Sequence, residues 1–472
     1  MRKVFRVYFS GWRRGLLCLF LACLLAGCLQ PTEEPKPLTP AKAAEPAPPL
    51  RSVLLISIDT LRADHLGCYG YERDTSPFLD RLAAEGTLFE NVSAQRGLTW
   101  PSLMSIMTSL YPVTHGVRQN GQLVDSQHLQ LAEILKQKGY RTAAFIANCQ
   151  HQNWKGFDTL EHLYDAEALE AATAWLKQEQ DKPFFLWVHL LAPHWNYMPP
   201  APYDTRFNPG YTGSIDGSNE SFFAAIHQQG QLSSQDVYQM RSLYDGEIAW
   251  DNDLLADFFS TLDPHPQIRQ ILTVITADHG EELYDHNRYW DHKESVYQSV
   301  LHVPLIFYAP GHVPQGRRVP SVSQSIDIAP TILSFLDMPV PPAFQGTPLS
   351  FVPDQGLRDR GPAFSEWEDR ILCIRDGNYK YIFNPSDFHP PKLRGEFREK
   401  FLIDTRELYD LSEDPNETEN LVGIRPAIAE NLHEKLMDWK EDYGWQLNTD
   451  PYSHEPMIPE IEEQLRALGY LE

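Results

Sequence analysis

The sequence has 472 residues, of which 42% are hydrophobic and 22% are charged, and its formal net charge is −24 at pH 7. This length and composition exclude a disordered chain and suit a globular protein with one large domain or two smaller ones. The acidic balance argues against nucleic acid as a partner, because an acidic body repels a polyanion. The chain has six cysteines, which are too sparse to imply a disulfide framework.

The first 27 residues are typical of a secretory signal peptide. Residues 1–14 carry five basic residues and no acidic one, and residues 15–26 form an apolar run shorter than the ~20 residues of a membrane-spanning helix. The tetrapeptide LAGC, which ends at Cys28, resembles the cleavage site of a bacterial lipoprotein, in which the cysteine is lipidated. We therefore expect an extracytoplasmic lipoprotein anchored to a membrane, in the periplasm or at the outer membrane if the source is a diderm bacterium. A plain secretory signal and an uncleaved anchor are the alternatives.

Residues 28–50 connect this signal to the rest of the chain. They are rich in Pro, Ala and Glu and lack apolar periodicity. Such a composition predicts a semi-extended tether and not a folded domain. Folded sequence is expected from residue 51 onward.

Strands and helices alternate over residues 51–350. Continuous apolar runs, typical of parallel strands buried on both faces, occur at 52–59, 140–148, 183–191 and 270–278. Helical patterns occur between them, at 77–85, 129–139 and 236–262. This alternation predicts an α/β fold, a three-layer α/β/α sandwich around a mostly parallel sheet.

The pattern changes after residue 350. Short strands are expected at 370–377 and 379–383, and helices near 426–443 and 459–468. We interpret residues 351–472 as a smaller C-terminal α+β subdomain that packs against the first part and completes the fold.

The stretch TWPSLMSIMTS predicts a further helix from Thr99 to about Ser109. Proline is tolerated in a first helical turn, so Pro101 favours Thr99 as the N-cap. A hydroxyl at this position also lies where backbone N–H groups and the helix dipole favour negative charge, such as that of a phosphate or an alkoxide. Thr99 is a candidate cap and a candidate nucleophile, and the pattern alone favours the cap.

Two aspartates follow apolar runs directly and indicate a metal site. Asp59 ends the run SVLLISID, and Asp278 ends QILTVITAD and precedes His279. Ligands of open α/β sheets bind beyond the carboxyl ends of the strands, so the two carboxylates can converge on one crevice. With His279 and Thr99 they form a set of oxygen and nitrogen donors that suits one divalent cation.

Several longer motifs resemble those of one family. They are SVLLISIDTLRADHLGCYG, TWPSL with TSLYPVTHGV, FFLWVHLLAPH, TADHGEEL, HVPLIFYAPG and ELYDLSEDPNETENL. In this order, over residues 52–425, the chain resembles the sulfatase family of the alkaline phosphatase superfamily. The resemblance implies an α/β/α sandwich with a smaller C-terminal subdomain. It also implies a metal-dependent hydrolase whose substrates are small-molecule, lipid-linked or glycan esters.

The resemblance assigns roles to individual residues. The metal ligands it implies, around one Zn²⁺, Mn²⁺ or Ca²⁺, are Asp59, Thr99, Asp278 and His279. The catalytic residues it implies are Thr99, His194, His292 and Lys293. Thr99 takes the place of the nucleophile, and the other three match positions that contact the transferred group and the leaving group.

The nucleophile motif departs from that of true sulfatases. They carry Cys or Ser in Cys/Ser-x-Pro-x-Arg, and this residue is oxidised to formylglycine, whose hydrate attacks sulfur. Here Thr99 would give a ketone, which hydrates poorly, and Leu103 replaces the arginine. Thr60 also replaces an acidic residue that is common in sulfatases. A threonine nucleophile matches the superfamily members that act on phosphorus, so we expect a hydrolase or transferase of phosphate or phosphonate esters with a covalent phosphothreonine.

Three alternatives stay open at this point. The first is a sulfatase that works without formylglycine. The second is a two-metal phosphodiesterase, whose additional ligands would be His189, His194, His292 and Asp285. The third is a catalytically inactive sulfatase-like protein that binds a glycan or another partner, although buried carboxylates are costly without a cation.

Overall fold

The computed structural model of the chain describes residues 48–147, 153–178, 181–229, 232–262, 265, 268–286, 292, 295–351, 361–368, 370–385 and 404–443. All of them belong to one of the two units into which the chain divides, Ala47–Glu472. The expected signal peptide, the tether up to residue 47, Lys293 and the expected helix at 459–468 lie outside the described residues. Within the described part, no helix has both the length and the apolar character that crossing a membrane requires.

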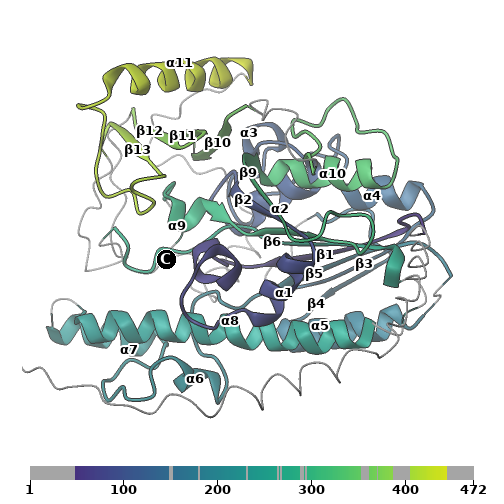
Figure 1. The fold of residues 1–472 in the computed structure, drawn as a ribbon, viewed down its shortest axis with the longest axis horizontal. Coiled ribbons are helices and arrows are strands. Elements are labelled where there is room, and N and C mark those ends of the chain that lie inside the picture. Colours follow the sequence, from purple (N-terminus) through teal and green to yellow (C-terminus); the bar gives the residue numbers. More distant parts are fainter. Residues whose placement is uncertain are drawn as a thin grey trace, which may run out of the picture. The chain divides into compact units, whose positions relative to one another are not determined.

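The central sheet has nine strands in the described part of the chain (Figure 1). In chain order they are β1 Ser52–Ile58, β2 Thr87–Ser93, β3 Arg141–Ile146, β4 Thr159–His162, β5 Phe184–Leu190, β6 Ile271–Ala277, β7 His302–Val303, β8 Leu305–Tyr308 and β9 Arg317–Gln324. Their order in the sheet is β4-β3-β5-β1-β6-β8-β2-β7, and β9 pairs with β2.

The part of the sheet around β1 is parallel. β1 pairs in parallel with β5 and β6, and β3 pairs in parallel with β4 and β5. Every residue of β1, β5 and β6 is buried, as their continuous apolar runs predicted. Ile58 pairs with Leu190 of β5 and with Ala277 of β6, so the carboxyl ends of three neighbouring strands meet at one edge of the sheet.

The remaining strands make the sheet mixed. β8 is antiparallel to β6 and β2, β7 is antiparallel to β2, and β9 is parallel to β2. The sequence patterns did not predict β2, because Glu90 and Asn91 interrupt its apolar run at two half-buried positions. Most strand pairs are nevertheless parallel, which confirms the predicted fold class.

Helices cover both faces of this sheet (Figure 1). One face carries α1 Pro77–Glu85, α5 Asp165–Leu176 and α8 Ser234–Leu262, and the other carries α2 Thr99–Thr108, α4 Leu131–Gln137 and α10 Ile328–Phe335. The first part of the chain also contains α3 Pro112–His115, α6 Tyr203–Arg206, α7 Asn219–Gln229 and α9 Gln298–Leu301, and 3₁₀ turns lie at Ala63–His65, Gly67–Tyr69, Ile268–Gln270 and Ser325–Asp327. The predicted three layers are therefore present. All residues of α2 are buried, so this helix lies inside the protein with its N-terminus near the end of β6.

The C-terminal part forms a second, antiparallel sheet. Its strands, in both chain and spatial order, are β10 Ala363–Trp367, β11 Ile371–Asp376, β12 Tyr379–Phe383 and β13 Arg406–Asp410. Helix α11, Pro426–Asp442, buries one apolar face against this sheet, where the ring of Trp439 stacks on that of Phe364 with centroids 4.7 Å apart. This arrangement is the smaller α+β subdomain that the sequence predicted.

Candidate metal centre and active site

Asp59 and Asp278 lie side by side at the carboxyl edge of the parallel strands. Each follows its strand directly, and the strands pair at Ile58 and Ala277. Both carboxylates are fully buried. The backbone N–H groups of His279 and Thr60 donate to Oδ1 of Asp278 at 2.8 and 3.2 Å, which fixes that oxygen. Thr60 makes its contact from the left-handed region, at φ 55°, which a non-glycine residue adopts only at a cost.

The tautomer of His279 places a lone pair on the side of the two carboxylates. Its Nδ1 lies 2.9 Å from the carbonyl oxygen of Gly280, and a carbonyl only accepts, so Nδ1 carries the proton. The lone pair on Nε2 then faces Oδ2 of Asp278 at 3.4 Å and Oδ1 of Asp59 at 3.7 Å. A lone pair that faces two carboxylates is repulsive unless a positive charge lies between them. The ligand atoms of the three residues lie within 4.8 Å of one another, close enough to share one metal ion.

The electrostatics of the same three side chains support this interpretation. Burial, together with the neighbouring charge of Asp59, raises the pKa of Asp278 well above its usual value. Burial, followed by the nearby ring of His292, lowers the pKa of His279 well below its usual value. Among the described residues, Oδ2 of Asp278 and Oγ1 of Thr60 have no hydrogen-bond partner. Two carboxylates and a neutral imidazole in a dry site fit a divalent cation such as Zn²⁺, Mn²⁺ or Ca²⁺.

Thr99 is the first residue of α2, and its side chain is directed at this group. The expectation that Thr99 is the N-cap is wrong, because α2 begins at Thr99 and its N-cap is Leu98. Oδ1 of Asn120 instead accepts the N–H of Trp100 at 3.0 Å, which satisfies a donor of the first turn. The Thr99 hydroxyl is thereby free of a capping role, and its Oγ1 lies 3.4 Å from Nε2 of His279.

His292 and His194 extend the site on the side of His279. The ring centroid of His292 is 4.4 Å from that of His279 and 5.4 Å from that of His194. Nδ1 of His292 lies 3.2 Å from Oε1 of Glu281, and Nδ1 of His194 donates to the carbonyl oxygen of Trp195 at 2.7 Å. In both rings Nδ1 is occupied, so Nε2 is the nitrogen that can exchange a proton. Lys293, which was expected beside them, lies outside the described residues.

Of the four additional ligands of the two-metal alternative, His189, His194 and His292 lie near the metal centre and Asp285 does not. Asp285 forms an ion pair with Arg62 at 2.6 Å and lines a different cavity. Burial raises the pKa of Asp285, but the charge of Arg62 outweighs this effect and holds it below its usual value. His189 lies on β5 close to Asp59, with its Nε2 3.8 Å from Oδ2. Because its carboxylate is paired with the guanidinium of Arg62, Asp285 is not available as a metal ligand.

Three residues near the site were missed by sequence reasoning. Glu281 orients His292, and the only signal for it was its place in the motif TADHGEEL. Arg62 donates to the carbonyl oxygen of Glu281 at 3.0 Å and so connects the segment after β1 to the segment after β6. Asn120 supports the first turn of α2 from a loop, and no sequence pattern pointed to it.

The fold and the candidate ligands define a class of protein, the metal-dependent hydrolases of the alkaline phosphatase superfamily. The family model described as Sulfatase matches residues 51–338, which is more than half of the sequence. The chain therefore belongs to the sulfatase family.

Individual relatives include enzymes with different chemistry. An N-acetylglucosamine-6-O-sulfatase of Bacteroides thetaiotaomicron is 22% identical, with 94% of this chain and 93% of the relative covered. The multifunctional alkaline phosphatase superfamily protein PehA of Trinickia caryophylli is 26% identical, with 83% of this chain and 95% of the relative covered. Among solved structures, the phosphonate monoester hydrolase of Agrobacterium radiobacter is similar with a TM-score of 0.67 at 23% identity, over 83% of this chain and 96% of that chain. A protein in complex with its substrate D-glucosamine-2-N,6-O-disulfate is similar with a TM-score of 0.71 at 20% identity, over 84% and 98%.

Proposed function

We propose that this protein hydrolyses or transfers phosphate- or phosphonate-type esters and that Thr99 is its nucleophile. The observation that carries the proposal is the position of the Thr99 hydroxyl, 3.4 Å from Nε2 of His279 and without a capping role in α2. A buried hydroxyl at a helix N-terminus and beside metal ligands is suited to attack as an alkoxide.

The residues around Thr99 favour phosphorus over sulfur. Threonine is a secondary alcohol, so it cannot give the aldehyde hydrate with which formylglycine sulfatases attack. Leu103 occupies the position of the arginine that orients this hydrate, and its side chain is fully buried within α2. An unmodified alkoxide is a competent nucleophile for phosphorus when the charge of the transferred group is offset.

The proposed reaction has two displacements. A divalent cation held by Asp59, Asp278 and His279 would lower the pKa of the attacking hydroxyl and neutralise charge on the substrate. Thr99 loses its proton to water, and its Oγ1 bonds to phosphorus as the bond from phosphorus to the leaving oxygen breaks.

In the first displacement, Nε2 of His194 or His292 gives a proton to the leaving oxygen, and Lys293 offsets the anionic charge of the transferred group. In the second displacement, water or a second alcohol returns a proton to this histidine as its oxygen bonds to phosphorus. The bond from phosphorus to Oγ1 breaks, and Thr99 takes a proton from water and is a hydroxyl again.

Sulfate ester hydrolysis is the second candidate. It is favoured by the relative from Bacteroides thetaiotaomicron, whose alignment covers 94% of this chain. On either proposal we infer the same range of substrates, namely small-molecule, lipid-linked or glycan esters.

A panel of substrates separates the two candidates. Aryl phosphodiester, phosphonate monoester, phosphomonoester and sulfate monoester would be compared side by side, with added Zn²⁺, Mn²⁺ or Ca²⁺. We expect kcat/KM for the phosphodiester or the phosphonate to exceed that for the sulfate ester by about 100-fold or more. Faster hydrolysis of the sulfate ester would reject the phosphorus proposal and favour the second candidate.

We also propose that the protein is a lipoprotein anchored through Cys28. The charged leader, its short apolar core and the tetrapeptide LAGC support this location. Detergent should then be needed to extract the wild-type protein from membranes, and Cys28→Ser should release or mislocalise it. Equal behaviour of the two forms on fractionation would overturn the proposal.

A further inference from the structure

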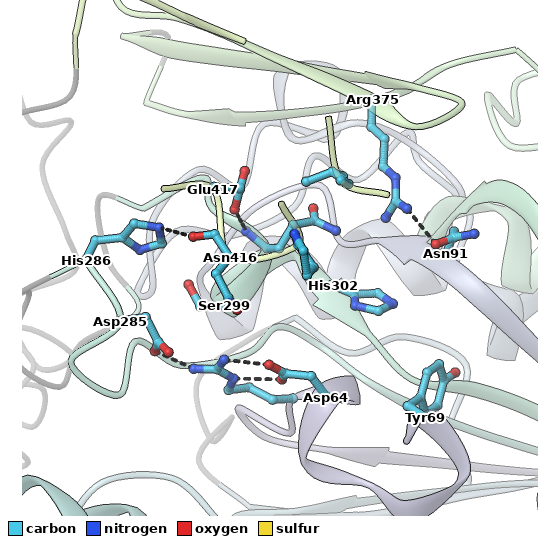
Figure 2. A pocket seen from close by; sticks show the side chains of 14 residues that line it. Asp64, Tyr69, Asn91, Asp285, His286, Ser299, His302, Arg375, Asn416 and Glu417 are labelled. Atoms are coloured by element: carbon cyan, nitrogen blue, oxygen red, sulfur yellow. Dashed lines mark hydrogen bonds and ion pairs between the residues drawn. The ribbon is translucent and has the colours of Figure 1, made fainter. Parts of the chain in front are cut away.

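A cavity of about 290 Å³ lies where the central sheet meets the C-terminal subdomain (Figure 2). Asn91 of β2, Ser299 of α9 and His302 of β7 contribute to its wall from the first part, and Arg375 of β11 and Glu417 contribute from the second. None of the proposed metal ligands lines it. It is therefore a site distinct from the metal centre.

Arg375 is the side chain that indicates a ligand. It extends from β11 toward Asn91 and His302 in Figure 2, and only 6% of the residue is exposed. Its Nη2 donates to Oδ1 of Asn91 at 2.5 Å. Within the described residues, Nε and Nη1 have no hydrogen-bond partner. Burial lowers the pKa of Arg375 to about 10, so the group is charged at neutral pH. Buried donors on a charged group are costly when they are not satisfied.

The acidic groups in the wall are already paired. Asp64 pairs with Arg62 at 2.7 Å, and Asp285 lies between Arg62 and Arg241. The carboxylate of the remaining acid, Glu417, pairs with Lys380 at 2.6 Å and also accepts the N–H of Gln298 at 2.5 Å.

Arg375 is left as the unbalanced charge. No carboxylate among the described residues forms an ion pair with it, and Glu417, whose charge acts on the pKa of Arg375, is paired with Lys380. The wall also contains His286, whose charge is balanced by Glu282 behind it. When the ion-pair partners behind the wall, Arg241, Lys380 and Glu282, are counted with the lining residues, one positive charge is in excess.

Two further polar atoms of the wall indicate which other chemical groups a ligand of this cavity would have. Oγ of Ser299 is buried and, among the described residues, without a hydrogen-bond partner. Nε2 of His302 donates to the carbonyl oxygen of Glu90 at 2.8 Å, so its Nδ1 is an acceptor. Burial and then the charge of Arg375 lower the pKa of His302 to about 4, which keeps the ring neutral. An acceptor beside donors suits a ligand that has hydroxyl groups as well as an anionic group.

We propose that this cavity binds a small hydroxylated organic carboxylate, with Arg375 holding the carboxylate and Ser299 and His302 binding hydroxyl groups. A single negative charge matches the single unbalanced cation of the wall, and a charge-assisted hydrogen bond is the strong kind available to a guanidinium. The volume is about ten times that of a water molecule, so it holds a small organic molecule and not only a bare ion.

Gluconate is the probe for the test, and glucose is its neutral control. Binding to the purified full-length protein would be measured by calorimetry at roughly 10 mM ligand or less. We expect gluconate to bind and glucose not to bind. Arg375→Gln should weaken gluconate binding by about tenfold or more, and Ser299→Ala by several-fold. Arg406→Gln, which removes an arginine of the same sheet outside the cavity, should bind as the wild type does.

Other outcomes reject the proposal. Absence of gluconate binding, equal binding of glucose, or equal binding of inorganic sulfate would each contradict a hydroxylated carboxylate as the ligand. Unchanged affinity in Arg375→Gln would show that the probe binds elsewhere. If Arg375→Gln does not fold, as judged by its melting transition, the affinity of Ser299→Ala decides the question in the same way.

Discussion

Nε2 of His189 lies 3.8 Å from Oδ2 of Asp59, and both side chains are fully buried. The indole N–H of Trp187 donates to Oγ of Ser57 at 2.9 Å, and the Ser57 hydroxyl lies 2.9 Å from Nδ1 of His189. Oγ of Ser57 accepts from Trp187, so the Ser57 hydroxyl donates its own proton to Nδ1 of His189. The proton of His189 is therefore on Nε2, which faces Asp59. Burial lowers the pKa of His189, so the ring is neutral. Hydrogen bonds through Trp187, Ser57 and His189 thus direct the Nε2–H group of His189 toward Asp59, a candidate metal ligand.

The first prediction concerns His189 and its contact with Asp59. His189→Leu should weaken metal binding by about tenfold or more, because outer partners fix the orientation of metal ligands. His189→Gln should restore much of the affinity, since its amide nitrogen can take the place of Nε2. Metal content after dialysis against a chelator series would be measured together with the melting temperature. A Leu variant that retains metal as well as the wild type would show that His189 is only a core residue.

The metal ligands themselves give the second prediction. Asp59→Asn, Asp278→Asn and His279→Ala should each hold less than about a tenth of the wild-type metal. They should still fold, because the strands that carry them are packed along their whole length. Asp278→Asn should not lower the stability of the metal-free protein, since it removes a buried charge beside Asp59. His115→Gln, at a buried histidine outside this group, is the control and should keep its metal. Normal metal content in all three ligand variants would contradict the site.

Residues of the parallel strands were predictable, and those that depend on distant partners were not. The apolar runs before Asp59 and Asp278 specify strands buried on both faces, and the paired carboxylates follow from the register of β1 and β6. The capping of α2 was not predictable, because its acceptor, Asn120, comes from a loop about 20 residues further on. The ion pair between Asp285 and Arg62 was not predictable for the same reason, because the two residues are far apart in the sequence. Local patterns determine elements, whereas the partner of a single polar side chain depends on the complete fold.

His286 gives a pH dependence of stability. Its Nδ1 lies 3.3 Å from Oε2 of Glu282 and its Nε2 lies 3.1 Å from the carbonyl oxygen of Asn416, so both nitrogens face acceptors. Burial lowers the pKa of His286, but the charge of Glu282 and of its acidic neighbours outweighs this effect and raises it to about 9. The native state then binds a proton that the unfolded chain loses near pH 6.5.

The protonated ring of His286 stabilises the native state at the lower end of this pH range. Stabilisation by this proton is complete below about pH 6.5 and is lost as the pH rises through about 9, by up to about 3 kcal/mol. The free energy of unfolding in urea would be compared at these two pH values for wild type and His286→Gln. We expect the wild type to lose more stability than the variant over this interval, and Glu282→Gln to reduce the loss as well. Equal slopes in wild type and His286→Gln would reject the assignment.

The last prediction concerns the proposed covalent intermediate on Thr99. Thr99→Ala should lower kcat on the best phosphorus ester by about 10³-fold or more, because it removes the oxygen that we propose bonds to phosphorus. Thr99→Ser should stay within about tenfold of the wild type, since it keeps the attacking oxygen. Ser105→Ala is the matched control, because this hydroxyl lies on the same helix and contacts His115, away from the proposed ligands. Acid quenching during turnover, followed by mass spectrometry, should find a phosphoryl or phosphonyl group on the peptide that contains Thr99. Substantial turnover by Thr99→Ala, or a trapped group on Ser102 instead, would show that another oxygen attacks. In that event the geometry beside His279 would serve to bind the substrate and not to form the bond.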